Sequence, residues 1–318
     1  MTADRSPSTA IRNPQPRPLD LRQPGPGITR FTIPLAMSSP DHLHVHLLEM
    51  PNGWLLVDCG ARGSEGALDA GLNAAGGSVD RVLITHAHVD HWGLATTLTE
   101  EVMAHPGVES SLRFASEGPP RDARPGWPDS DQMSRAFAGF ERMISGVPEV
   151  APIADGDLIG EWQVLWTPGH DPGHVCLYRQ SDGVLLCGDL LLPGFTPNIQ
   201  PDPSGRDALG DFLASLDRVA ALPIELVLPA HGAPYTDAAA RARELRRHHA
   251  ERLDRLREAL LSGIRTLVDL CAAAFSADYA SEADRMLALM ETYAHLEHLR
   301  LRGAALVDDK GAWSLSPL

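Results

Sequence analysis

Short apolar runs that end in polar or glycine-marked loops recur between residues 28 and 235. Segments 28–33, 43–50 and 54–58 have the apolar patterns of strands, and Pro51-Asn52-Gly53 predicts a hairpin turn between the last two. Further strands are predicted at 81–84, 162–166, 175–178, 184–187 and 226–228, and helices at 64–75, 92–100, 130–145 and 207–220. Predicted strands and helices are thus interspersed along this stretch of the chain.

The character of the chain changes at both ends. Residues 1–27 are rich in Pro and Arg and have no apolar core, so we expect an N-terminal arm that is disordered or docked. After residue 236 the pattern predicts a long charged helix at 237–261, helices at 266–275 and 281–302, and a hairpin across 308–311. We therefore expect three parts: the arm 1–27, a main domain 28–236 and a small C-terminal domain 237–318.

Histidine and aspartate side chains stand where the predicted strands end. Imidazole and carboxylate groups are standard ligands for divalent metal ions. His86 and His88 lie two residues apart in an extended segment, so both can face one ion, whereas Asp90 and His91 follow a turn and can face a second ion. Five His and two Asp shared by two ions leave room for water, which is typical of a catalytic site: His86, His88, Asp90, His91, His170, Asp189 and His231.

Four motifs in this order carry a family resemblance. HxHxDH (86–91), TPGH (167–170), GD (188–189) and PAHG (229–232) resemble the metallo-β-lactamase-fold hydrolases from about residue 28 to about residue 235. The resemblance implies an α/β (α+β) fold, an αββα sandwich with two mixed sheets face to face and helices outside. It also implies that His86, His88 and His170 hold a first metal, that Asp90, His91 and His231 hold a second, and that Asp189 bridges them. A fold that has lost its metals is disfavoured, because every ligand position is filled.

The expected cofactors are two divalent metal ions. Zinc is the default for His and Asp ligands, and iron or manganese is allowed because no thiolate ligand excludes them. In such a site a metal-bound hydroxide attacks an electrophilic carbonyl or phosphorus. Asp90 is then both a ligand and the candidate catalytic residue that orients the nucleophile or carries its proton.

Two further polar residues could support the ligands. Asp58 ends a strand in the position of the family's VDxG motif, where it would orient a metal-bound His, although an Asp that starts a turn before glycine is the alternative. His174 repeats the TPGHxPGH pattern, and we favour a supporting or structural role over direct catalysis. His42, His44 and His46 alternate on one face of a strand and are expected to pack there rather than to form another metal site.

Apolar residues near the motifs are candidates for a substrate pocket. Segment 116–145 is either a lid over the site or a helix that packs on the core, and it carries Trp127, Phe137 and Phe140. If these side chains face the site, the substrate has an apolar portion. Phe195 and Ile199, in the Pro-rich segment after Asp189, are either pocket walls or surface packing.

Composition restricts the partners. Lys+Arg number 27 against 42 Asp+Glu, and the net charge of −15 argues against general affinity for nucleic acid. No apolar run approaches the roughly 20 residues of a membrane helix, so no membrane is expected. The four cysteines have no CxxC spacing, which favours a reducing cytoplasm.

The C-terminal pattern of helix, helix and hairpin resembles a winged helix. Such a module is similar to the C-terminal domain of the subgroup that includes LACTB2-like endoribonucleases and some polyketide-pathway thioesterases. Its second helix, 281–302, carries several acidic residues, which favours a packing or homodimerisation element over a nucleic-acid reader. Our leading hypothesis is a hydrolase of a small ester, thioester or lactone. The alternatives are a metal-dependent endoribonuclease (phosphodiesterase) acting on RNA and, from another class, a DNA-binding regulator.

Overall fold

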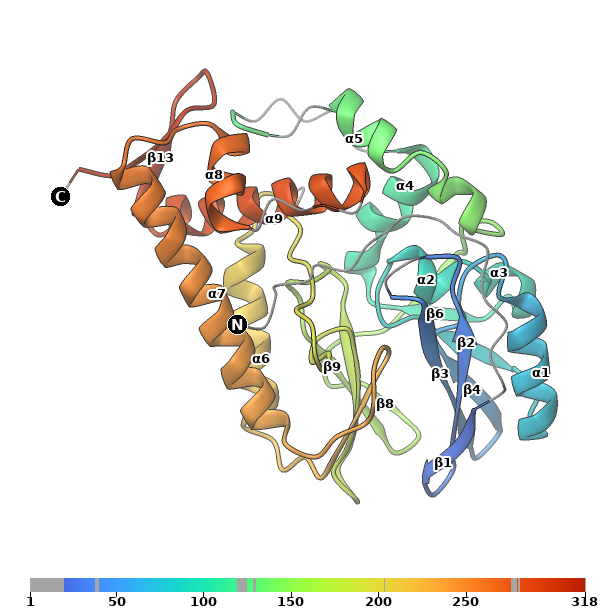
Figure 1. Ribbon diagram of the computed structural model, residues 1–318. Coiled ribbons are helices and arrows are strands. Elements are labelled where there is room, and N and C mark those ends of the chain that lie inside the picture. Colours follow the sequence, from blue (N-terminus) through green and yellow to red (C-terminus); the bar gives the residue numbers. More distant parts are fainter. Residues whose placement is uncertain are drawn as a thin grey trace.

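The computed structural model describes residues 20–37, 40–118, 125–127, 130–202, 204–275, 279 and 281–317. They form two mixed β-sheets that pack face to face, with helices on the outer face of each sheet (Figure 1). The expected α/β sandwich is therefore confirmed.

Within the part of the chain that the structure describes, the first sheet has seven strands in chain order. Strands β1 to β4 are antiparallel, and β4 to β7 are parallel. The turn before Gly53, whose φ is 109°, joins β3 to β4. Residues 1–19 of the expected arm lie outside the described residues, and β1 pairs with β2. The strands are β1 (Leu21–Gly25), β2 (Ile28–Pro34), β3 (His42–Met50), β4 (Gly53–Val57), β5 (Arg81–Leu83), β6 (Val102–Ala104) and β7 (Val150–Pro152).

The second sheet has five strands in the order β12-β11-β10-β9-β8, and only the pair β11–β12 is parallel among its described strands. Its inner face packs Val164, Leu177 and Leu186 against Leu48 and Leu83 of the first sheet. Burial of this apolar layer holds the sheets together. The strands are β8 (Leu158–Ile159), β9 (Trp162–Trp166), β10 (Val175–Arg179), β11 (Val184–Gly188) and β12 (Leu226–Pro229).

Helices cover the outer faces as expected, with two local differences. Ser64 precedes α1 but does not cap it, because its hydroxyl donates to the Pro34 carbonyl at 2.6 Å. The single helix expected at 92–100 is two short helices, because the Leu94 N–H donates to Gly60 O instead of continuing the helical ladder. The first sheet carries α1 (Glu65–Ala75), α2 (Val89–Trp92), α3 (Ala95–Leu98), η1 (Pro106–Val108) and α4 (Glu109–Glu117); the second carries α6 (Ala208–Ala220) and α7 (Ala238–Leu261).

A third apolar cluster joins segment 130–145 to the C-terminal helices. It includes Met133 and Phe137 together with Leu256, Leu270 and Met286. Segment 130–145 is not one helix, because Gly139 has a φ of 107° and separates α5 (Ser130–Ala136) from η2 (Phe140–Met143). The C-terminal elements are α8 (Leu267–Ala274), α9 (Glu282–Leu301), β13 (Ala305–Val307) and β14 (Trp313–Leu315).

Helix α9 lies across the end of the sandwich and reaches the region of α4 and α5 (Figure 1). Most of its side chains are buried from Ala283 to Leu299. Within the described ranges, no helix is both long and apolar enough to cross a membrane.

Candidate metal centre

The seven predicted ligands converge where strands of both sheets end. The loop after β5 holds His86 and His88, and the first turn of α2 holds Asp90 and His91. His170 lies between β9 and β10, Asp189 follows β11, and His231 follows β12. Because the strands end at one edge of the sandwich, residues that are 145 positions apart become neighbours: His86, His88, Asp90, His91, His170, Asp189 and His231.

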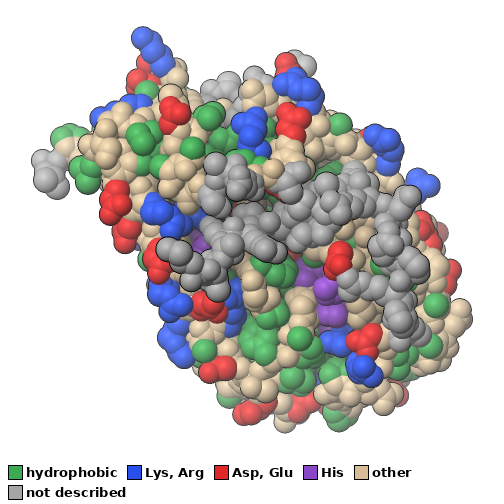
Figure 2. Space-filling model, viewed as in Figure 1, with side chains coloured by type: hydrophobic (Ala, Val, Ile, Leu, Met, Phe, Trp, Pro, Cys, Tyr) green, Lys and Arg blue, Asp and Glu red, His purple; other side chains and the backbone are tan. Residues whose placement is uncertain are grey.

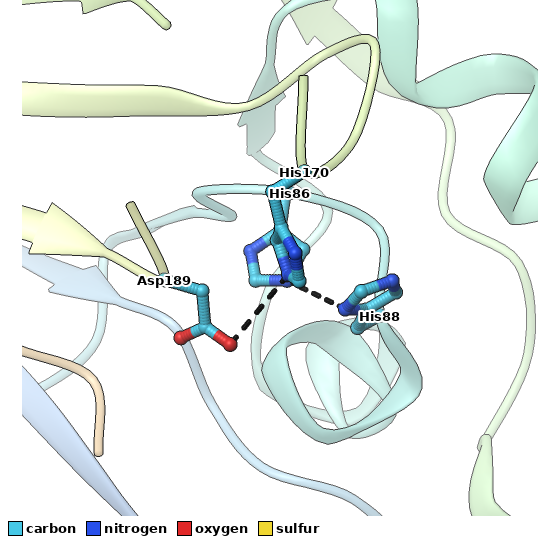
Figure 3. Close-up of side chains that lie close together, drawn as sticks. All are labelled: His86, His88, His170 and Asp189. Carbon is cyan, nitrogen blue, oxygen red and sulfur yellow. Dashed lines mark hydrogen bonds and ion pairs between the residues drawn. The ribbon is translucent and has the colours of Figure 1, made fainter. Parts of the chain in front are cut away.

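His86, His88 and His170 form the first ligand group, and their ring nitrogens point at one another (Figure 3). His86 Nε2 lies 3.0 Å from His88 Nδ1 and 3.2 Å from His170 Nε2. Asp189 Oδ2 lies 3.6 Å from His170 Nε2.

Asp90, His91 and His231 form the second ligand group. Asp90 Oδ2 lies 3.6 Å from His91 Nε2 and 3.4 Å from His231 Nε2. The other oxygen of Asp189, Oδ1, lies 3.6 Å from His91 Nε2 and 3.5 Å from His231 Nε2. Asp189 therefore presents one carboxylate oxygen to each group, an arrangement that suits a bridging ligand.

The unpaired atoms of the cluster fit divalent cations. His91 Nε2, His231 Nε2 and Asp189 Oδ1 are buried, and none has a hydrogen-bond partner among the described residues. Buried polar atoms are rarely left unpaired, because each costs free energy comparable to a lost hydrogen bond. Nitrogen and carboxylate donors that face a shared space are the donor set that zinc, iron and manganese prefer.

The two ligand groups differ in the protonation of their histidines. In the first group, burial lowers the pKa of His88 to about 4 and lowers those of His86 and His170 well below the ordinary value, so these imidazoles are neutral and keep a lone pair for a metal. In the second group, burial also disfavours the charged form of His91, but the carboxylates of Asp58, Asp90 and Asp189 outweigh it and raise the pKa of His91 to about 10. The same carboxylates would attract a cation.

Asp58 and Thr85 support the second group from behind. The His91 Nδ1 nitrogen lies 2.9 Å from Asp58 Oδ2, and Thr85 donates its backbone N–H to Asp58 Oδ1 at 2.8 Å. Asp58 has a φ of 60°, a left-handed conformation that is uncommon for a residue other than glycine, and this conformation is fixed by those bonds. His231 Nδ1 donates to the carbonyl of His42 at 2.6 Å. Such partners fix the ring orientation of a metal-binding histidine.

His174 supports the bridging ligand. Its Nε2 accepts the backbone N–H of Asp189 at 3.1 Å, and its Nδ1 lies 2.8 Å from Thr167 Oγ1. Gly188 lies directly before Asp189, and a Cβ there would come within 2.7 Å of His174 Nε2. Only glycine therefore allows His174 to approach the turn that carries Asp189.

Other polar residues near the ligands have structural roles. His44 Nε2 lies 2.8 Å from the Gly232 carbonyl, so it joins β3 to the loop that carries His231 and is not part of a metal cluster. Cys59 and Cys187 are fully buried free thiols, and neither lines the cavity described below.

A cavity of about 360 Å³ opens beside the ligands, and His88, Asp90, His170, Asp189 and His231 form part of its wall. The predicted residues Trp127, Phe137, Phe140 and Phe195 all line it. Further apolar walls come from α4 and α9, through Phe114, Leu287 and Met290.

One candidate pocket residue lies outside the pocket. Ile199 does not line the cavity, because its side chain is fully buried in the core between the second sheet and α6. Segment 116–145, for which we expected a lid or a core-packing helix, both lines the cavity and packs in a core in its described part, whereas residues 119–124, 128 and 129 lie outside the described residues. Phe137 belongs to the third apolar cluster and lines the cavity as well.

The sequence did not indicate that two further residues would contact the first ligand group. Asn198 contributes its backbone carbonyl, which accepts from His170 Nδ1 at 2.7 Å, and the Gln200 amide lies 3.4 Å from His88 Nε2. A carbonyl is present in every residue, so the side chain at 198 could not have predicted this contact.

Comparisons with known proteins agree with this geometry. The model of the metallo-beta-lactamase superfamily matches residues 40–231, which is more than half of the chain. The probable metallo-hydrolase YqjP of Bacillus subtilis is 28% identical over 277 residues, covering 78% of this chain and 85% of that protein.

Two solved structures resemble nearly the whole chain. A beta-lactamase domain protein from Burkholderia ambifaria has a TM-score of 0.80 and 27% identity, covering 93% of this chain and 94% of its own. The metallo-beta-lactamase family protein TTHA1429 from Thermus thermophilus has a TM-score of 0.78 and 30% identity, covering 92% of this chain and 99% of its own. The similarity therefore includes the C-terminal helices.

Proposed function

The chain belongs to the metallo-beta-lactamase superfamily of metal-dependent hydrolases, and from this premise we propose that it uses two divalent ions to hydrolyse a small ester, thioester or lactone with an apolar portion. One observation carries the proposal: two ligand groups that share Asp189 form one wall of a cavity whose other walls are largely apolar. A small-molecule site is typically such a concave, mostly apolar space with a few polar groups at the reacting end.

The ions, when bound, supply Lewis acidity and lower the pKa of water towards neutrality. His86, His88 and His170 would hold one ion, Asp90, His91 and His231 the other, with Asp189 between them. Zinc is our first choice, and iron or manganese would suit the same donors.

We assign different roles in the reaction to the protein groups around the ions. Asp90 lines the cavity, and its Oδ2 faces both His91 and His231, so we assign it to orient the attacking water and to accept its proton. Asp58 and the His42 carbonyl fix the rings of His91 and His231, and His174 fixes the backbone of Asp189. The apolar walls exclude water from the substrate and bind its apolar portion.

A substrate panel tests this function. Purified protein is assayed with p-nitrophenyl esters, acyl-CoA thioesters, lactones, bis-p-nitrophenyl phosphate and single-stranded RNA, with and without added Zn²⁺ or Mn²⁺. We expect metal-dependent hydrolysis of an ester, thioester or lactone that Asp189→Ala abolishes. RNA cleavage that Asp189→Ala abolishes, with the esters untouched, would instead establish the alternative.

That alternative, a LACTB2-like endoribonuclease, is supported by the order of α8, α9 and the hairpin β13–β14, which is the order we expect of the helices and wing of a winged helix. We rank it second for two reasons. The helix that would read nucleic acid is α9, and its side chains are mostly buried. Lys and Arg side chains are also interspersed with Asp and Glu over the described part of the face in Figure 2, whereas phosphate binding needs a basic face. We propose that segment 237–318 instead buttresses the active site.

A further inference from the structure

Segment 190–201 follows Asp189 and lies behind the first ligand group. The Asn198 carbonyl accepts from His170 Nδ1 at 2.7 Å, and the Gln200 amide lies 3.4 Å from His88 Nε2. Both contacts are made to the ring nitrogen that points away from the other ligands, since His170 Nε2 and His88 Nδ1 face His86. Two of the three histidines in this group therefore take their orientation from segment 190–201.

The segment is in turn attached to the C-terminal helices. The Asn198 side-chain amide donates to Glu291 Oε2 of α9 at 2.8 Å and to the Leu287 carbonyl at 3.3 Å. The other oxygen of Glu291 accepts from Arg252 of α7, and the Arg252 guanidinium lies 3.8 Å from the centre of the Phe275 ring. Closer to Asp189, Arg241 of α7 donates to the carbonyls of Leu192 and Phe195, both at 2.7 Å.

The Arg252–Glu291 pair is unlike an ordinary surface ion pair. Arg252 is 1% exposed and Glu291 is 3% exposed. Taking both charges out of water is costly, and apolar residues of similar size are often as stable in such a place. Core packing alone therefore does not account for the pair. The carboxylate contributes something an apolar residue cannot, which is a directed acceptor for Asn198.

Glu291 also lies beside His249 and His295, and one donor atom from each of the three lies within 4.8 Å of the others. This group does not form a further metal site. Arg252 and Asn198 already occupy both oxygens of Glu291, and His249 Nδ1 lies at hydrogen-bond distance, 3.1 Å, from His295 Nε2.

The second ligand group is supported differently. Asp58, after β4, and the His42 carbonyl, in β3, orient His91 and His231. One support lies in the first sheet and the other directly follows one of its strands. Loss of an anchor on α7 or α9 should therefore disturb one ligand group and spare the other.

We infer that Arg252, Glu291 and Asn198 form a clamp through which the C-terminal helices position His170 and set the affinity of the first ligand group for its ion. The inference rests on the proposed two-metal function. Glu291 and Arg252 are positioning residues, because they reach the ligand group through Asn198 and His170.

Two double variants isolate the clamp. Both Glu291→Gln/Arg252→Met and Glu291→Leu/Arg252→Met remove the buried charges, but only the first keeps an oxygen that can accept from the Asn198 amide. The two proteins are titrated with Co²⁺ and Zn²⁺, and bound metal and the visible spectrum of cobalt are measured. We expect the Gln/Met protein to bind two ions like the wild type. The Leu/Met protein should bind one of them about 10- to 100-fold more weakly and the other unchanged.

A single variant and a control complete the test. Asn198→Ala keeps the ion pair and the backbone but removes the side-chain amide. It should weaken binding of the same ion. This result tests the clamp even if a double variant does not fold. Glu297→Gln is the matched control, because Glu297 pairs with Arg300 on the same helix, at 2.8 Å, away from segment 190–201. It should leave the affinity for both ions unchanged.

Equal affinities in the Gln/Met and Leu/Met proteins, or equal weakening of both ions by Asn198→Ala, would overturn the clamp. Fewer than two ions in the wild-type protein would contradict the proposed function instead, so the two failures are distinguishable.

Discussion

Replacing Phe140 by Ala should change selectivity for the length of the acyl chain. Phe140 lines the cavity and is only partly buried, and its ring lies 5.3 Å from that of Phe137. Each CH₂ of a substrate that enters an apolar cavity gains about 0.8 kcal/mol, or about fourfold in kcat/KM. From acetyl to hexanoyl, four CH₂ groups would raise kcat/KM by up to about 250-fold on the same basis.

Removing the ring takes away one apolar wall. Contact with a side chain of this size is worth about 1.5–3 kcal/mol, so kcat/KM for hexanoyl ester should fall about 10- to 100-fold. Acetyl ester is too short to use the wall and should lose less than about threefold by the same reasoning. The slope of log kcat/KM against chain length, measured with p-nitrophenyl esters from acetyl to octanoyl, reports this directly, because the leaving group is constant.

The control is Phe31→Ala, in β2. Phe31 is fully buried in the core of the first sheet and does not line the cavity. It should lower the melting temperature but leave the slope unchanged. If Phe140→Ala lowers kcat/KM by the same factor for every ester, the wall does not bind the acyl chain. The proposed substrate class is then wrong.

Three further predictions follow from the site and from one helix cap. Chelation should abolish hydrolysis and two equivalents of Zn²⁺ should restore it; metal analysis that finds less than one equivalent, with no gain on reconstitution, would contradict this. Asp90→Ala should lower kcat by about 10²- to 10⁴-fold, whereas Cys59→Ala and Cys187→Ala, at buried thiols outside the cavity, should change kcat little; similar losses in all three would indicate another chemistry. Asp207 caps α6 by accepting the Gly210 N–H at 2.8 Å, so Asp207→Ala should cost about 1–2 kcal/mol of unfolding free energy at pH 7. Burial alone would raise the pKa of Asp207, but hydrogen bonds from His298 and from the Gly210 N–H lower it overall. This stabilisation is therefore present above the ordinary carboxyl pKa of about 4 and is lost as pH falls through the lower folded-state pKa. A melting-temperature difference between Asp207→Ala and wild type that stays constant from pH 7 to pH 3 would be inconsistent with it.

The sequence predicts the ligand cluster well because its signal is local. The ligands follow the ends of apolar runs, and His170, Asp189 and His231 each lie next to a glycine. Strand ends meet at one edge of a sheet. The fold follows for the same reason, since the apolar runs that form the inner faces of the two sheets are visible in the sequence.

The supports of the cluster are harder to predict because they are not local. Arg252 lies in a helix whose sequence predicts a charged, solvent-exposed surface. Its side chain is nevertheless buried against Glu291, 39 positions away. Asn198 acts through its backbone carbonyl. Ile199 lies in neither of its two expected places, a pocket wall or the surface, because an apolar residue in a loop can also pack into the core and the sequence does not distinguish these places. The break at Gly139 depends on a φ of 107°, which glycine permits but does not require.

Helix α9 supplies part of the cavity wall through Leu287 and Met290, and both residues lie beyond the segment 40–231 that the family model matches. Part of the cavity wall is therefore encoded in a stretch of the gene that is separate from the one encoding the candidate metal ligands. Directed evolution could exploit this separation. A small library at Leu287 and Met290 would alter the breadth of substrates accepted while every candidate metal ligand, and Glu291 on the same helix, stays intact.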